Sequence, residues 1–522
     1  MGATPLLLAI DAGTGSCRAL LFDLDCRLIS SALREWRHQE PDGVTGGRDF
    51  DVDANWAAIV WCIREATRRA GVDTADIRAV SSTSMREGVV LYDAAGREIW
   101  ACPNVDGRAV DEAAELVRDG RAEQIFREGG DWVSMTTPAR LLWLARHRPD
   151  LLERVAGIGM LSDWILCRLS GELVTEPSCG SSSGMFDLGA RVWSRTTSKT
   201  SGFPFGNLPP VVDPGTVIGE VTAAVAEQTG LRAGTPVVVG GADTQLALLG
   251  AGIGESQYAV IGGTFWQNTV LLGEPLVDPE IRLRTLCHVI PGQWMLEGIG
   301  FYCGMGMRWF RDAFCEAEVA RAAASGEDID AYTFMEAAAA AVPPGSNGVL
   351  AILSGLMNAR RWVQASPSFL QFDVDDPVGS GKAACIRALE EAAAYVVRGH
   401  RDIIRDVTGS IADDVIFTGG AAKGTLWPQI IADVLDAPVH VPLVKESSAL
   451  GAAVCAGTGV GVFASLVEPR ELLAGSERTL LPDREAAASY TENYRRWQAV
   501  YERMLSLSDD GLLNPLWRPP GV

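Results

Sequence analysis

The sequence predicts an α/β protein of two domains, and three observations support this fold class. The chain has 522 residues, whereas a single hydrophobic core stops growing at about 250–300 residues. Strand and helix patterns alternate along it, as they do in α/β folds. Two Gly-rich hairpin turns, at Gly13 and Gly262, each follow an apolar run and carry a Thr. This repetition predicts a duplicated fold, which we divide into residues 1–252 and 253–522.

The elements of the first half follow from periodicity and from turn residues. Apolar runs predict strands, amphipathic runs predict helices, and segments rich in Ser, Gly or Pro predict loops. We expect strands at 6–10, 17–22, 80–83 and 237–239. Helices are expected at 56–70 and 162–170, a third helix begins at Thr137-Pro138, and a fourth ends at Leu249. Loops are expected at 178–184 and 197–210. Gly71 and Gly171 end two of these helices. Gly250, Gly252 and Gly254 predict a hinge before the second half.

The second half repeats the opening hairpin and then continues as a βαβ pattern. Tyr258–Ile261 and Phe265-Trp266 flank the turn Gly262-Gly263-Thr264. Further strands are expected at 414–418 and 438–441, helices at 383–407 and 426–435, and a loop at 419–424. Strands that alternate with helices in this way indicate a largely α/β second half.

Composition excludes several classes of function. The formal net charge of −21 disfavours nucleic-acid binding through a basic face and electrostatic docking on anionic membranes. The eleven cysteines are scattered and form no CxxC pair, which predicts reduced thiols rather than a zinc site or a disulfide framework. Leu6–Ile10 is too short for a signal peptide or a membrane span. We therefore expect a soluble, cytoplasmic protein.

Phosphoryl transfer needs a phosphate cradle, a metal site and a base, and each has a candidate. The cradle candidates are small residues whose backbone N–H groups are accessible, with nearby hydroxyls. They are Gly13, Thr14, Gly15 and Ser16 in the first turn and Gly262, Gly263 and Thr264 in the second. Two plain hairpin turns are the alternative, although the matched pair favours the cradle.

Two aspartates stand where apolar strands end. Asp11 directly precedes the first turn, where its carboxylate could hold Mg²⁺ beside phosphates; an Asx-turn is the alternative. Asp243 follows an apolar strand and a Gly-Gly turn. Ligands of open α/β sheets bind at the carboxyl ends of strands, so Asp243 could accept the proton of an attacking hydroxyl. Its alternative role is the N-cap of the following helix, and local sequence leaves both roles open.

Three further segments are candidates for binding. Arg86 and Glu87 offer a donor fork beside an acceptor, which suits vicinal oxygens, though a surface ion pair is the alternative. Asp106 could bind a second hydroxyl. Gly419 and Gly420 could lie against a nucleoside, with Lys423 near its ribose or phosphates or merely solvated.

Two other signals do not predict function. His400-Arg401-Asp402 resembles a protein-kinase catalytic loop, but the required Asn is missing and the segment continues a helix. The sequence has no Walker A motif.

Taken together, these motifs resemble the FGGY family of carbohydrate kinases over nearly the whole chain, within the actin–hexokinase–Hsp70 superfamily. The two turns are similar to its phosphate motifs, Gly419-Gly420 with Lys423 to its adenosine motif, and Gly241–Gln245 to its catalytic-aspartate motif. The resemblance implies two actin/ribonuclease-H-like domains with a ligand cleft between them, the cofactors ATP and Mg²⁺, Asp243 as catalytic base and Mg²⁺ ligand, and Thr244 at the substrate.

Other segments resemble one branch of the family, for which the implied acceptor is the terminal hydroxyl of 4,5-dihydroxypentane-2,3-dione. These segments are residues 35–38, 84–88, 263–267, 307–312, 497–501 and 516–521. A pentulose or polyol kinase, such as a xylulokinase, ribulokinase or glycerol kinase, is an alternative. A non-catalytic, nucleotide-dependent actin-like scaffold is another. The expected partners are small molecules, with a homodimer left open as the assembly.

Overall fold

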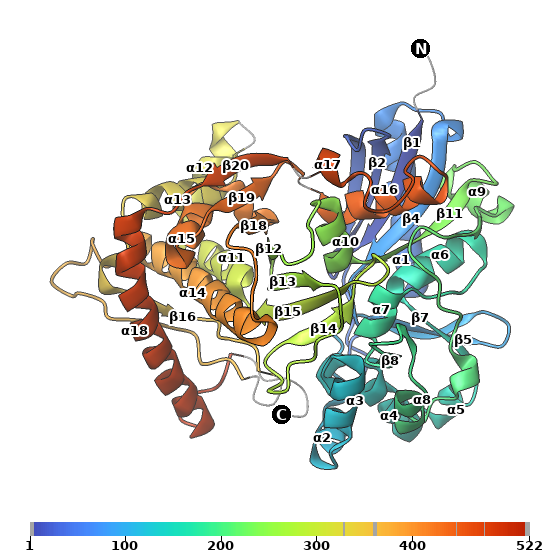
Figure 1. The fold of residues 1–522 in the computed structure, drawn as a ribbon, viewed down its shortest axis with the longest axis horizontal. Coiled ribbons are helices and arrows are strands. Elements are labelled where there is room, and N and C mark those ends of the chain that lie inside the picture. The colour runs from blue at the N-terminus through green and yellow to red at the C-terminus, as the bar shows by residue number, and fades with distance from the viewer. Residues whose placement is uncertain (1–4, 327–328, 359–362, 445, 474, 517–522) are drawn as a thin grey trace.

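Two mixed β-sheets, one from each half of the chain, form the framework (Figure 1). The computed structural model describes residues 5–326, 329–358, 363–444, 446–473 and 475–516. The tail segment 517–521, part of the predicted resemblance, lies outside the described residues.

The strands group into two large sheets and three small ones. The first sheet contains β1 (Leu6–Ala12), β2 (Ser16–Asp23), β3 (Leu28–Glu35), β4 (Ile77–Ser84), β10 (Val217–Glu220) and β11 (Pro236–Ala242). The second contains β12 (Tyr258–Gly262), β13 (Trp266–Leu272), β14 (Arg284–Cys287), β15 (Trp294–Gly300), β18 (Val415–Thr418), β19 (Val439–Pro442) and β20 (Ser476–Leu480). The small sheets contain β5 (Val89–Asp93), β6 (Glu98–Cys102) and β7 (Val155–Met160), then β8 (Phe186–Asp187) and β9 (Val192–Trp193), and β16 (Leu350–Ile352) and β17 (Ser368–Leu370).

The helices surround these sheets. In the first half they are α1 (Val52–Ala70), α2 (Val110–Arg118), α3 (Arg121–Gly129), α4 (Thr137–His147), α5 (Pro149–Leu152), α6 (Leu161–Ser170), α7 (Pro177–Ser182), α8 (Arg195–Thr200), α9 (Ala223–Thr229) and α10 (Asp243–Gly250). In the second half they are α11 (Cys303–Phe314), α12 (Glu316–Ser325), α13 (Ala331–Ala340), α14 (Lys382–Thr408), α15 (Leu426–Leu435), α16 (Ser447–Gly459), α17 (Arg470–Leu473) and α18 (Arg484–Asp509).

The two large sheets share one topology. In the first, the order β3-β2-β1-β4-β11 combines an antiparallel hairpin with strands parallel to β1. In the second, the order β15-β13-β12-β18-β19 repeats this arrangement, with β12 in the place of β1. The prediction of a duplicated, two-domain α/β fold is therefore confirmed.

Residues of β1 alternate between two hydrophobic cores, as the period of two in a strand requires. Leu6, Leu8 and Ile10 face one core, which contains residues of α1 and α6. Leu7 and Ala9 face another core, which contains residues of α10 and α16. The first sheet is thus buried on both faces, which explains the continuous apolar run of its first strand.

Helix α16 packs on the first sheet although it follows β19 of the second half. Figure 1 shows it across β1, β2 and β4. Helix α10 lies between the two sheets: it contributes Leu246 and Leu249 to the core under the first sheet and Leu248 to a core with Ala259 and Leu271 of the second. The amino end of α10, where Asp243 lies, is therefore held at the junction of the two halves.

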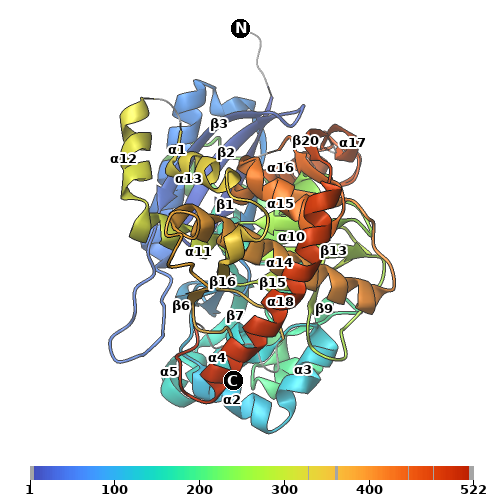
Figure 2. The same ribbon diagram turned by 90° about the vertical axis from the view of Figure 1, so that its left-hand side faces the viewer.

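The second sheet packs on α14, and α18 covers the outer side of that half (Figure 2). Tyr490, Tyr494 and Trp497 of α18 are buried against Tyr395 of α14. His400 lies inside α14, in agreement with the reading of that segment as helix rather than catalytic loop. No helix in the described parts of the chain is both long and apolar enough to cross a membrane.

Two predicted loops contain helices, so these predictions were wrong in part. Residues 177–182 form α7, and residues 195–200 form α8. The Glu176 side chain accepts hydrogen bonds from the backbone N–H groups of Ser178 and Cys179, which caps α7. Because serine hydroxyls bond back to carbonyl groups within the turn, a Ser-rich segment becomes a buried helix.

Candidate active site

Three parallel strands of the first sheet bring the predicted catalytic and binding side chains to one edge. In the register of β1, β4 and β11, Asp11 pairs with Thr83, and Ala242 pairs with Ser84. Asp11 is the penultimate residue of β1, Arg86 and Glu87 follow β4, and Asp243 follows β11. Segments that lie far apart in the sequence therefore meet at the carboxyl edge of the sheet, where α/β proteins bind ligands.

Asp243 is the first residue of α10, and its carboxylate accepts hydrogen bonds from the next residue. Oδ1 accepts the backbone N–H of Thr244 at 2.6 Å and its hydroxyl at 3.3 Å. The N-cap position belongs to Ala242, so the N-cap alternative for Asp243 does not describe this geometry. Burial raises the pKa of Asp243 to about 6; Arg86 lowers it, whereas Asp11 and Glu87 raise it. Asp243 therefore lies within the electrostatic reach of three other predicted site residues.

Asp11 is buried and paired with a cation that the sequence analysis did not identify. The Arg18 guanidinium donates to Oδ2 of Asp11 and also to Oε2 of Glu446, which precedes α16. Arg18 lies opposite Asp11 in the β1–β2 register. That register is a usable signal, because the turn length of a hairpin fixes which residues face each other. The Asx-turn alternative receives no support from these contacts.

Side chains of the first half hold the first turn in place, and the space beside its Gly15 is open. Trp36 Nε1 donates to the carbonyl oxygens of Gly13 at 3.1 Å and Thr14 at 3.2 Å, and Asn104 Nδ2 donates to the Thr14 hydroxyl at 3.1 Å. A Cβ added at Gly15 would meet no atom within 4 Å. The turn is thus rigidly positioned, with free space where a ligand could approach its backbone.

The second turn and the predicted adenosine segment contact each other directly. A Cβ at Gly419 would stand 2.8 Å from the carbonyl oxygen of Gly262, and Gly419 has a φ of 94°. Both features require glycine at this position. Gly263, Gly420 and Lys423 are exposed, and Thr264 is partly exposed. The structure therefore brings these two motifs together into one surface in the second half.

The alternative for Arg86 and Glu87 was a surface ion pair. Arg86 Nε does lie 4.0 Å from Oε1 of Glu87, but Arg86 is buried, and both side chains have closer partners. Arg86 Nη1 donates to Oε2 of Glu297 at 3.0 Å, and Oε1 of Glu87 accepts from Arg284 Nη1 at 2.8 Å. Arg284 also pairs with Asp131 at 3.1 Å. Sequence analysis missed Asp131, Arg284 and Glu297. The signal available for Glu297 was a carboxylate inside the apolar run of β15, since buried carboxylates require partners.

Asp106 is almost fully buried, and Arg140 connects it to the backbone of Glu87. Its Oδ1 accepts from the backbone N–H of Arg48 at 2.8 Å and from Arg108 Nε at 2.7 Å. Its Oδ2 has no hydrogen-bond partner, and Arg140 Nε lies 3.5 Å away. Arg140 donates to the Glu87 carbonyl oxygen. Asp106 therefore keeps one oxygen that accepts no hydrogen bond and has only the charge of Arg140 beside it, within the network that fixes the Arg86-Glu87 segment.

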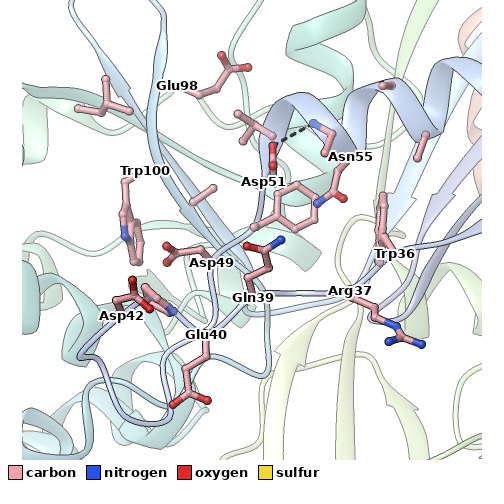
Figure 3. A pocket seen from close by; sticks show the side chains of 18 of the residues that line it. Trp36, Arg37, Gln39, Glu40, Asp42, Asp49, Asp51, Asn55, Glu98 and Trp100 are labelled. Atoms are coloured by element: carbon pink, nitrogen blue, oxygen red, sulfur yellow. Dashed lines mark hydrogen bonds between the residues drawn. The ribbon is translucent and has the colours of Figure 1, made fainter.

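A surface hollow of about 1030 Å³ lies outside this site (Figure 3). Its lining comes from residues 34–58, from β6 and from Arg148 and Leu151, and includes none of the predicted site residues. In Figure 3, Gln39, Asp49 and Asp51 gather near its centre between Trp36 and Trp100. It adjoins the site through Trp36, whose backbone N–H and ring support the first turn, and through Asp49, which pairs with Arg108, a partner of Asp106. We therefore assign the chemistry to the strand edge rather than to this hollow.

Metal-binding potential at the strand edge rests on Asp11 and Asp243. Within the described ranges of the chain, no group of three or more His, Cys, Asp or Glu residues is arranged to hold a metal ion. Mg²⁺ in phosphoryl-transfer enzymes binds through one or two carboxylates together with substrate phosphates. The two aspartates fit that kind of site rather than a cage made of protein ligands alone.

Comparison with known protein families gives two adjoining matches. Residues 6–250 match the FGGY family of carbohydrate kinases, N-terminal domain, and residues 259–460 match its C-terminal domain. Together the two matches cover most of the chain.

Full-length relatives agree with this match. Autoinducer-2 kinase of Salmonella paratyphi B is 45% identical over 520 residues, which cover 99% of this chain and 98% of the relative. Among solved structures, xylulose kinase from Lactobacillus acidophilus has a TM-score of 0.84 and 19% identity, covering 96% of this chain and 98% of that one. Xylulose kinase from Rhodospirillum rubrum has a TM-score of 0.82 and 26% identity, with coverage of 96% and 99%.

Proposed function

The chain belongs to the FGGY family of carbohydrate kinases, and we propose that its acceptor is the autoinducer-2 precursor 4,5-dihydroxypentane-2,3-dione, phosphorylated at its terminal hydroxyl. Family membership makes the chain an ATP-dependent phosphotransferase that acts on a sugar-like substrate. The observation that carries the choice of acceptor is the full-length likeness to autoinducer-2 kinase, which exceeds the likeness to the xylulose kinases.

We propose that the two Gly-rich turns bind the phosphates of ATP. Gly13, Thr14, Gly15 and Ser16 act from the first half, and Gly263 and Thr264 act from the second. The free space at Gly15 supports this role, because phosphate oxygens must approach backbone N–H groups closely. Gly419, Gly420 and Lys423 lie beside the second turn and are assigned to the adenosine.

Acceptor binding is assigned to Arg86, Glu87, Asp106 and Thr244. A guanidinium donates to carbonyl and hydroxyl oxygens, whereas carboxylates accept from hydroxyl groups. No hydrogen bond to another described residue engages Nη2 of Arg86, and Oδ2 of Asp106 accepts no hydrogen bond, although it forms an ion pair with Arg140 at 3.5 Å. These groups can therefore hold a small molecule that carries both hydroxyl and carbonyl oxygens.

Asp243 is assigned as the base. With a pKa near 6, its carboxylate is ionised at neutral pH and remains a better proton acceptor than an ordinary aspartate. It orients the attacking hydroxyl and accepts its proton as the bond to the γ-phosphorus forms and the bond to the departing ADP oxygen breaks.

The Mg²⁺ that accompanies ATP would be held by Asp11 and Asp243 together with the phosphates. When bound, Mg²⁺ neutralises charge on the phosphate oxygens. Arg18 already contacts Asp11 and supplies positive charge on the same side, so it orients that carboxylate.

A substrate panel tests this proposal. Purified protein with ATP and Mg²⁺ is given the pentanedione, xylulose, ribulose or glycerol in turn, and ADP release is measured. We expect the highest kcat/KM with the pentanedione. A higher value with xylulose, ribulose or glycerol would make the protein a pentulose or polyol kinase, and no phosphorylation of any acceptor would favour the scaffold.

The remaining assignments concern organisation and location. Residues 1–252 and 253–522 are proposed as the two domains, with the ligands between them. All eleven cysteines are free thiols, which fits a reducing compartment such as the cytoplasm. Sedimentation velocity would test whether the protein forms a homodimer.

A further inference from the structure

Arg284 and Glu297 form a buried ion pair on the second sheet. They face each other in the β14–β15 register, and Arg284 Nε donates to Oε1 of Glu297 at 2.7 Å. Glu297 is fully buried and Arg284 nearly so. Burial by itself would raise the pKa of Glu297, but Arg284 and Arg86 hold it below its ordinary value. Two ionised groups kept inside the protein require well-placed partners.

The partners of this pair lie on the first half of the chain. The second carboxylate oxygen of Glu297 accepts from Arg86 Nη1 at 3.0 Å. Nη1 of Arg284 donates to Glu87 Oε1 at 2.8 Å and to Asp131 Oδ2 at 3.1 Å. Each of the two adjacent side chains that follow β4 is thus fixed by a different member of the pair. The pair therefore contacts the two proposed acceptor-binding side chains themselves, and not merely the surface of the first half.

The segment that carries these side chains has little freedom of its own. Glu87 has a φ of 59°, an uncommon value for a residue with a side chain. Its carbonyl oxygen accepts from Arg140, and its N–H lies 3.4 Å from the Ser182 hydroxyl. The backbone is therefore held by the first half, whereas the direction of the charged groups is set by the second half.

We infer that Arg284 and Glu297 are positioning residues for the acceptor: they aim the Arg86 guanidinium and the Glu87 carboxylate, so that acceptor affinity depends on these two side chains of the second half. The inference rests on the proposed assignment of Arg86 and Glu87 to the acceptor. Loss of either positioning residue releases one side chain from its productive direction. ATP, assigned to the two turns, should be affected little.

A matched control distinguishes the positioning of Arg86 and Glu87 from a general contribution to the interface between the two halves. Arg191 also crosses between them: it donates to the carbonyl oxygens of His288 at 2.8 Å and Gln293 at 2.6 Å. Within the described parts of the chain, the contacts of its guanidinium are these two carbonyl groups and the Trp294 ring, and they do not reach Arg86 or Glu87. Arg191→Met should therefore weaken docking without redirecting the acceptor side chains.

The experiment compares Glu297→Gln, Arg284→Met and Arg191→Met with the unmodified protein. KM for acceptor and KM for ATP are measured with whichever panel acceptor the unmodified protein phosphorylates, together with the thermal midpoint with and without acceptor. We expect Glu297→Gln and Arg284→Met to raise the acceptor KM at least tenfold, to leave the ATP KM within twofold, and to abolish the acceptor-induced rise in midpoint. Arg191→Met should lower the midpoint and keep both KM values.

The following outcomes decide the inference. An unchanged acceptor KM in Glu297→Gln, or an equal rise in Arg191→Met, would overturn it and leave the pair a structural contact. Glu297→Asp, which keeps the charge, should restore part of the affinity. Arg86→Ala is measured in parallel: an unchanged acceptor KM there would refute the proposed acceptor site itself, which distinguishes that failure from failure of the positioning role.

Discussion

Gly451 of α16 lies directly against the carbonyl group of Leu246 in α10: a Cβ on Gly451 would stand 2.1 Å from that oxygen. At the other end of the contact, a Cβ on Gly250 would stand 2.0 Å from the carbonyl oxygen of Ser447. The backbones of the two helices therefore touch along their crossing. Because α10 begins at Asp243, this contact supports the element that carries the proposed base.

Gly451→Ala should destabilise the protein and lower activity together. The methyl group has no space unless α10 and α16 separate, and such overpacking costs about 1–3 kcal/mol of unfolding free energy. Denaturant unfolding measures that loss, and turnover reports the displaced base. Gly206→Ala is the control, because a Cβ at exposed Gly206 would meet no atom within 4 Å. Equal stability of the two variants would contradict the close contact.

Asp243→Asn should lower kcat by about 10²–10⁴-fold, the contribution of a positioned base. ATP affinity should change far less, because the phosphates are assigned to the two turns and Asp11 remains as a carboxylate for Mg²⁺. The amide keeps the size of the side chain and a carbonyl oxygen for the Thr244 N–H, but it cannot take up the proton. Steady-state kinetics and nucleotide titration give the two values.

The control for this substitution is Asp42→Asn, at an exposed carboxylate in the surface hollow of Figure 3. It should turn over at the normal rate. Near-normal turnover in Asp243→Asn would remove the proposed role of that residue.

Much of the fold could be predicted because its signals are local. Leu6–Ile10, the Gly-rich turn and Cys17–Phe22 predict a hairpin from neighbouring residues alone, and the structure contains it as β1 and β2. The predicted helix at 426–435 likewise coincides with α15. The placement of α16 on the first sheet was not predictable in this way, because a run of small apolar residues does not specify which sheet will cover it.

The residues of the candidate site likewise fall into a predictable group and an unpredictable group. Asp11 lies near the end of one buried strand, and Arg86 and Asp243 follow two others, so their meeting at one edge follows from strand order. The contacts of Arg284 and Glu297 with Arg86 and Glu87 could not be predicted from strand order, because they join two sheets formed by distant parts of the sequence. Pairings between distant segments carry no local periodic signal.

Gly15→Ala should raise the KM for ATP about tenfold or more, which corresponds to about 1.4 kcal/mol of binding free energy, without affecting stability. The new methyl group meets no protein atom but occupies the space through which we assign phosphate contact with the turn. The thermal midpoint without ligand should therefore match that of the unmodified protein. An unchanged KM for ATP would place the phosphates elsewhere.

Acid should destabilise the protein through His400. Its Nε2 accepts the Met357 N–H at 3.0 Å, and its Nδ1 lies 3.0 Å from the Val396 carbonyl oxygen. Burial lowers the pKa of His400 to about 4, whereas an unfolded histidine titrates near 6.5. Between these values the unfolded chain binds a proton that the folded chain does not.

The free energy of unfolding should therefore fall as pH drops from about 6.5 towards 4, by up to about 1.4 kcal/mol per pH unit from this one group. Urea unfolding at several pH values measures the slope. His400→Gln removes the titrating group, so its slope should be shallower by that amount, while its stability above pH 7 reports only the altered packing. Identical slopes in the two proteins would show that His400 does not stay neutral in the fold.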